Sequence, residues 1–89
     1  MDFTNQTFEQ FVETRWLVTC PQERAFVAQE TDCPAVANAS AVYIYGNGFV
    51  LHIVAGVLFY SHAWGYRAVA YTSLREAERS LYEWSREWV

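Results

Sequence analysis

The feature that most constrains this chain is a long uncharged segment in its middle, because no Asp, Glu, Lys or Arg lies between Asp32 and Arg67. Within it, residues 41–60 have the length of about 20 mostly apolar residues that a membrane-spanning helix needs. The composition favours a sheet instead, since Val, Ile, Tyr and Phe dominate the segment. The Gly-Asn-Gly triplet at 46–48 suits a tight hairpin, and no Arg/Lys cluster flanks the segment to orient an insertion. We therefore predict strands and no membrane span.

Glycines divide this segment into predicted strands. The breaks fall at 46–48, near Gly56 and at 64–65. Connections this short join antiparallel neighbours, so the strands form a meander. Neither face of the second strand is strongly polar, so either both sheet faces are partly covered or one of them binds a partner. The four predicted strands are Ser40–Tyr45, Phe49–Ala55, Val57–Ala63 and Tyr66–Tyr71.

An amphipathic helix is predicted after the strands. Ser73 and Glu76 have the spacing of a capping box, in which each side chain satisfies a free backbone N–H at the helix start. The apolar residues that follow recur at intervals of three and four, which gives a stripe that packs on one face of the sheet. This stripe consists of Leu74, Ala77, Leu81, Trp84 and Trp88.

The first third of the chain predicts a helix over 6–15, capped by Thr4 or Asn5. Two alternatives stay open after it: a short helix that begins near Pro21, or an edge strand over 16–19 or 24–29. No linker divides the chain, so residues 1–89 are predicted to form one α+β domain. Its predicted parts are one or two N-terminal helices, a three- or four-stranded antiparallel meander and the closing helix.

The negative charge of the chain is concentrated at its N-terminal end. Residues 1–32 carry six acidic side chains and two arginines, which accounts for the whole net charge of −4. An acidic chain without lysine lacks the cationic surface that holds a phosphate backbone, so direct nucleic-acid binding is not expected. Acidity fits a basic protein partner, or it serves only solubility. The predicted secondary acidic surface consists of Glu9, Glu13, Glu23, Glu30 and Asp32.

Cysteine and histidine are the side chains of this chain that could act in catalysis or bind a metal ion. Cys20 and Cys33 lack a CxxC or Cys/His spacing and are interpreted as reduced thiols of an intracellular protein, with one disulfide between them as the alternative. His52 and His62 fall on consecutive strands without facing each other, and a metal site would need a third ligand that only the fold could bring close. No phosphate-binding or nucleophile motif is found. We predict no metal, no cofactor and no enzymatic activity.

Aromatic residues on the strands predict a partner surface. Tyr and Arg are enriched at binding hot spots because they combine a large contact area with a polar tip. We predict a flat binding face, and the alternative is that the tyrosines edge a small core with their hydroxyls in water. Such a face also leaves a homodimer open. The predicted partner residues are Tyr43, Tyr45, Tyr60, His62, Tyr66, Arg67 and Tyr71.

A short acidic chain in which a strand meander precedes the capped helix AYTSLREAERSLYEWSREW resembles small phage-encoded accessory proteins, including anti-CRISPR proteins. The resemblance is one of size and layout over the C-terminal half of the chain. It implies a stoichiometric inhibitor whose acidic side chains meet the basic nucleic-acid channel of a larger complex in the host-cell cytoplasm. The first ten residues lack the basic and apolar regions of a secretory signal, which also favours a cytoplasmic location.

We therefore predict a non-enzymatic protein-binding module. Two alternatives remain. The first is a binder of single-stranded RNA or DNA, with bases stacked on the tyrosines and phosphates held by arginines. The second is a small enzyme or metal protein that uses its cysteines and histidines.

Overall fold

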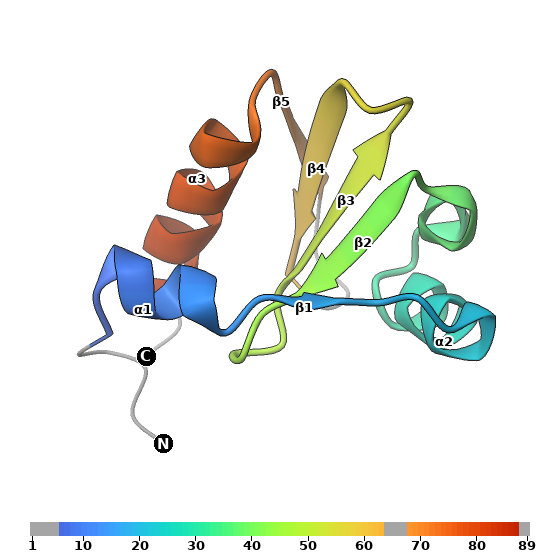
Figure 1. The fold of residues 1–89 in the computed structure, drawn as a ribbon, viewed down its shortest axis with the longest axis horizontal. Coiled ribbons are helices and arrows are strands. Elements are labelled where there is room, and N and C mark those ends of the chain that lie inside the picture. The colour runs from blue at the N-terminus through green and yellow to red at the C-terminus, as the bar shows by residue number, and fades with distance from the viewer. Residues whose placement is uncertain (1–5, 64–67, 88–89) are drawn as a thin grey trace.

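The uncharged segment and the strand just after it fold as the antiparallel meander that the sequence predicts (Figure 1). The computed structural model describes residues 6–63 and 68–87. No helix in these two ranges is long and apolar enough to span a membrane. Tyr66 and Arg67, at the start of the predicted fourth strand, lie outside the described residues. The strands of the meander are β2 (Ala41–Ile44), β3 (Val50–Val54), β4 (Leu58–His62) and β5 (Ala68–Tyr71).

A fifth strand, β1 (Trp16–Leu17), precedes the meander and corrects the predicted count of three or four. It pairs antiparallel with β2, so the sheet order is β1-β2-β3-β4-β5. The Val18 N–H continues the pairing with a 2.8 Å hydrogen bond to the Val42 carbonyl. Two residues are too few for a period-of-two pattern, which is why the sequence offered this strand only as an alternative.

The β2–β3 turn is tied to the end of the first helix. The Gly46 N–H donates to the Thr14 hydroxyl at 2.9 Å. A Cβ added at Gly46 would lie 3.0 Å from the Thr14 Cβ, so the close approach favours glycine. Gly48 has a φ of 88°, and its N–H donates to the Tyr45 carbonyl at 2.9 Å to close the turn.

Helices α1 (Phe8–Glu13) and α3 (Leu74–Arg86) lie on one side of the sheet (Figure 1). The cap of α1 is Thr7, in a reciprocal capping box with Gln10, and the predicted caps lie outside the described residues. The Ser73 hydroxyl caps α3 by accepting from the Glu76 N–H at 3.2 Å. The Glu76 carboxylate accepts from the Thr72 hydroxyl, a contact that the predicted box did not include.

The larger core cluster lies between these helices and the sheet, as the predicted packing of the last helix on one sheet face requires. Ala77 and Leu81 of the predicted stripe are fully buried, whereas Trp84 is only partly buried and Trp88 lies outside the described residues. The buried members of this cluster are Phe11, Tyr45, Phe49, Leu51, Ala63, Ala77, Leu81 and Tyr82.

The opposite sheet face is covered by α2 (Pro21–Glu30) and the short 3-10 helix η2 (Pro34–Asn38). Both open alternatives are therefore realised, since the edge strand at 16–17 precedes a helix that begins at Pro21. Residues 24–29 are helical and do not form the alternative strand. Both faces of the sheet are thus partly covered. The second cluster consists of Val18, Val27, Ala28, Val36, Ala39, Val42 and Val50.

The chain reverses sharply between α2 and η2. Asp32 has a φ of 54°, and the N–H groups of Asp32 and Cys33 donate to the carbonyls of Gln29 and Ala28. These two bonds form a Schellman motif, in which a left-handed residue ends a helix. The reversal brings Cys33 back to the sheet, where it packs against the second cluster.

Candidate functional site

The structure distributes the predicted partner residues over both faces of the sheet. Tyr43 and Tyr71 pack against the cluster under α1 and α3, and Tyr45 is buried within it. Tyr60 pairs with His52 across β3 and β4, and both side chains point to the opposite face. His62 lies on that face and is buried.

This division corrects the predicted flat aromatic face. Tyr66 and Arg67 lie outside the described residues, and the other five predicted residues form no single surface in the part of the chain that the structure describes. Alternation within each strand could be read from the sequence, but the alignment of one strand with the next decided which tyrosines share a face.

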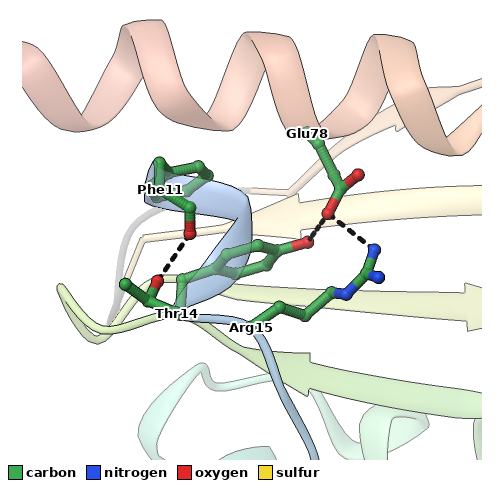
Figure 2. A network of polar contacts seen from close by, with 5 residues as sticks. Phe11, Thr14, Arg15 and Glu78 are labelled. Atoms are coloured by element: carbon green, nitrogen blue, oxygen red, sulfur yellow. Dashed lines mark hydrogen bonds and ion pairs between the residues drawn. The ribbon is translucent and has the colours of Figure 1, made fainter. Parts of the chain in front are cut away.

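Tyr45 belongs to a partly buried polar network with Glu78 and Arg15, and Figure 2 shows the latter two side chains. The Tyr45 hydroxyl donates to Glu78 Oε2 at 2.6 Å, and Arg15 Nη1 donates to the same oxygen at 3.0 Å. The Tyr45 ring also stacks on Phe11, with ring centroids 4.7 Å apart. The network joins the end of α1, the sheet and α3, so its geometry fits a structural role better than a partner contact.

Glu78 is the polar residue that sequence reasoning missed here, although it is buried in the structure. Its position held a signal, because it lies four residues after Leu74 and therefore on the same side of the helix. Burial raises the pKa of Tyr45 well above the ordinary tyrosine value, and the hydrogen bond to Glu78 and its charge add to that effect. Tyr45 consequently stays protonated in the folded protein.

Alkaline pH is expected to destabilise the wild type more steeply than Tyr45→Phe. The unfolded chain releases the Tyr45 proton near pH 10, whereas the folded protein retains it, so the unfolded state binds fewer protons above that pH. The contribution of Tyr45 is fully present below about pH 10 and is lost above it at about 1.4 kcal/mol per pH unit. Urea unfolding of both proteins across this range measures the difference, and parallel pH profiles would contradict it.

The predicted acidic side chains all face solvent, but they lie in two groups. Glu9 and Glu13 are on α1, and the others are on or just after α2, on the other side of the sheet (Figure 1). The arginines of this part of the chain bind internal acceptors. Arg15 pairs with Glu78, and Arg24 donates to the carbonyls of Val18 at 3.0 Å and Ala39 at 2.9 Å.

A Cys-His-His cluster lies on the sheet face that α2 and η2 partly cover. His62 pairs with Val50 and His52 pairs with Tyr60, so the two histidines are diagonal neighbours on one face of β3 and β4. Their Nδ1 (His52) and Nε2 (His62) atoms are 2.7 Å apart. Cys33 completes the group, and the candidate ligand atoms of all three residues lie within 4.8 Å of one another.

Both histidines of this cluster are almost fully buried, at 2% exposed each. Burial lowers the pKa of both rings, and the charge of His52 lowers the pKa of His62 further, to about 4. At neutral pH both imidazoles are therefore neutral, and one ring donates a hydrogen bond to the other. Neutral imidazole is also the form that binds metal ions.

The sequence correctly predicted that His52 and His62 are not directly opposite each other on neighbouring strands. It could not show that their rings are in contact as diagonal neighbours. It also left open which cysteine would approach them. Cys33 approaches because of the Asp32 reversal, while Cys20 precedes α2 as its N-cap residue and its Sγ lies 3.9 Å from Gln22 Oε1. Both thiols are free.

Comparison of this chain with protein-family models, curated proteins and solved structures gave no match. The resemblance to anti-CRISPR proteins therefore stands on layout alone.

Proposed function

We propose that this chain is a non-enzymatic protein-binding module that contacts its partner through β1 and α2. The observation that carries the proposal is the exposure of three large apolar side chains on these consecutive elements. Trp16 is 66% exposed, Leu17 is 48% exposed and Phe26 is 58% exposed. Trp is enriched at the hot spots of protein interfaces, and exposed apolar side chains that lie close together mark interaction sites. The pairing of Trp16 with Ile44 and of Leu17 with Tyr43 directs Trp16 to the α2 side of the sheet and Leu17 to the other side, so the three residues do not lie on one face. We call them together the β1–α2 surface.

The position of β1 in the sheet supports a strand-like partner segment. β1 is the terminal strand of the order β1-β2-β3-β4-β5, and β2 pairs along one of its sides (Figure 1). The outer backbone groups of an edge strand are a template on which an extended segment of another protein can add a strand. The side chains of Trp16 and Leu17 would then supply contacts above and below that added strand.

The charge around these elements selects a basic partner. Glu13 lies three residues before Trp16, and Glu23 lies in the first turn of α2, and both are exposed. Arg15 is paired with Glu78, so its charge is already compensated there, whereas Arg24 donates to neutral carbonyls and keeps its positive charge. Complementary charge raises the association rate and disfavours acidic competitors.

The resemblance in layout to anti-CRISPR proteins suggests what binding does to the partner. In that extension the basic partner belongs to a nucleic-acid-handling complex, and stoichiometric binding in the cytoplasm inhibits it. This part rests on the resemblance alone, whereas the β1–α2 surface rests on exposure and charge.

The exposed arginines of α3 give the nucleic-acid alternative little support. Arg79 forms an ion pair with Glu83 at 3.4 Å and lies over the Phe8 and Tyr82 rings. Arg75 and Arg86 alternate with exposed carboxylates at Glu76, Glu83 and Glu87. A helix face with interleaved charges of both signs is typical of a solvated surface.

The Trp16→Ser variant is expected to lose the partner while remaining folded, because the side chain is mostly exposed. Hot-spot tryptophans contribute about 2 kcal/mol or more to binding, so affinity should fall by roughly 30-fold or more. The partner captured by the tagged wild type and by the tagged variant from a lysate of the native host would be quantified, with and without nuclease. Binding of the captured partner is then measured with purified components.

Val57→Ser is the matched control, because Val57 is 64% exposed but lies in the β3–β4 turn. We expect this variant to retain the partner. A partner that Trp16→Ser retains, or one that disappears with nuclease, would contradict the proposal. If light scattering shows a homodimer that Trp16→Ser dissociates, the partner at this surface is a second copy of the chain and not a basic protein.

A further inference from the structure

We propose that Cys33, His52 and His62 form a binding site for a zinc ion. They are the one group of metal-ligating residue types that converges within the described ranges 6–63 and 68–87. Imidazole nitrogen and thiolate sulfur are the ligands that zinc prefers in proteins. The site is independent of the β1–α2 surface.

The three ligand atoms lie near one another, but not yet at the separations they would have around a bound ion. Zinc binds imidazole nitrogen at about 2.0–2.1 Å and thiolate sulfur at about 2.3 Å, so two nitrogens of a tetrahedral site lie about 3.3 Å apart. The two nitrogens here are 2.7 Å apart, and all three ligand atoms lie within 4.8 Å. Small side-chain rotations that open the His-His contact and draw in Cys33 would therefore form the site.

The fold holds each ligand in place from a different element. His52 and His62 lie on the central strands β3 and β4, where ladder hydrogen bonds fix the backbone. The His52 ring stacks on the Tyr60 ring at a centroid distance of 5.1 Å. Cys33 is fixed by the 3.0 Å hydrogen bond from its N–H to the Ala28 carbonyl. Rigid supporting groups of this kind favour metal binding because little ordering remains to be done.

Three protein ligands leave a fourth tetrahedral position for water. Cys33 is the least buried of the three, so an ion can approach from its side. Buried histidines without a metal would instead keep the direct ring-to-ring hydrogen bond, and the experiment separates these two interpretations.

The probe is Co²⁺, because it binds in zinc sites and its absorption spectrum depends on the ligands and on their geometry. We expect reduced wild-type protein to bind one Co²⁺ with visible tetrahedral bands and a near-ultraviolet thiolate-to-cobalt band. Added Zn²⁺ should displace the cobalt and remove both bands. Absence of these bands, or a stoichiometry that never saturates at one ion, would overturn the proposal.

The cysteines provide a matched pair of variants. Cys33→Ser is expected to lose the thiolate band and to weaken Zn²⁺ binding, measured by competition with a chelator, by roughly 100-fold, since even residues that only support a ligand change affinity by about 10–100-fold. Cys20→Ser should leave the band and the affinity unchanged. Equal effects of the two substitutions would overturn the assignment of Cys33.

Histidine variants test the other ligands and guard against a folding artefact. In His62→Gln the thiolate-to-cobalt band should be weaker and shifted, or absent. The far-ultraviolet circular dichroism of this variant should equal that of the wild type, which shows that it is folded. If His52→Gln and His62→Gln both bind cobalt as tightly as the wild type, the histidines are not ligands and the site is wrong.

Discussion

The Phe11→Ala variant is expected to lose about 3–5 kcal/mol of unfolding free energy, the usual range for truncating a buried aromatic side chain. Phe11 is 1% exposed and is the buried residue of the six-residue helix α1. A helix this short is not stable by itself, so packing of this one side chain holds it on the sheet.

The ring contacts of Phe11 explain why the effect is large. It stacks on Tyr45 at 4.7 Å with a 4° angle between the rings and lies 5.6 Å from Tyr82. Truncation would leave a cavity between α1, the sheet and α3. Small domains are stable by only about 5–15 kcal/mol, so urea unfolding should show a much lower midpoint.

Two further variants make the test of Phe11 specific. Phe11→Leu keeps most of the volume and should cost about 1–2 kcal/mol, which keeps the measurement possible if Phe11→Ala is largely unfolded. Phe26→Ala changes a helical phenylalanine that is 58% exposed and should shift stability by less than about 0.5 kcal/mol. Similar losses for Phe11→Ala and Phe26→Ala would show that α1 is not packed as described.

The second large effect is expected at Glu78, where Glu78→Ala should lower the unfolding free energy by about 3 kcal/mol. The substitution removes the acceptor of both the Tyr45 hydroxyl and the Arg15 guanidinium. Arg15 can turn to water because its side chain is 35% exposed, but Tyr45 is buried and its hydroxyl would stay unsatisfied. Urea unfolding at neutral pH measures the loss.

The Tyr45–Glu78 pair can be separated from the ion pair by a double-mutant cycle. Glu78→Gln retains an acceptor for Tyr45 and should cost less than Glu78→Ala. Tyr45→Phe combined with Glu78→Ala should cost less than the sum of the single variants, with a coupling of about 1.5–3 kcal/mol for a hydrogen bond to a charged group. Strict additivity would contradict the hydrogen bond between Tyr45 and Glu78.

Glu83→Ala is the matched control on the same helix. Glu83 forms an ion pair with Arg79, but its side chain is 63% exposed. Exposed pairs of this spacing contribute about 0.3–0.5 kcal/mol, so this variant should be close to wild type. A loss at Glu83 as large as that at Glu78 would indicate a general helix effect and would contradict the special role of the buried network.

Local patterns in the sequence determined the α+β class and the positions of the meander and the closing helix. Gly46, Gly48 and Gly56 mark two turns, and Ser73 caps the last helix where its spacing predicts. These features depend on neighbouring residues only, so one chain is enough to find them. The sequence also concentrated the negative charge in the first third, and the described acidic residues there are exposed.

Tertiary structure decided which of these residues meet. Strand alignment separated Tyr43, Tyr45 and Tyr71 from Tyr60, and it made His52 and His62 diagonal neighbours. The reversal at Asp32 brought Cys33 to those histidines. The positive φ of Asp32 could not be foreseen from composition, because residues other than glycine rarely adopt it. Periodicity gives the face of a side chain within its own element, but contacts between elements depend on alignment and on how the chain turns, and these are properties of the whole fold.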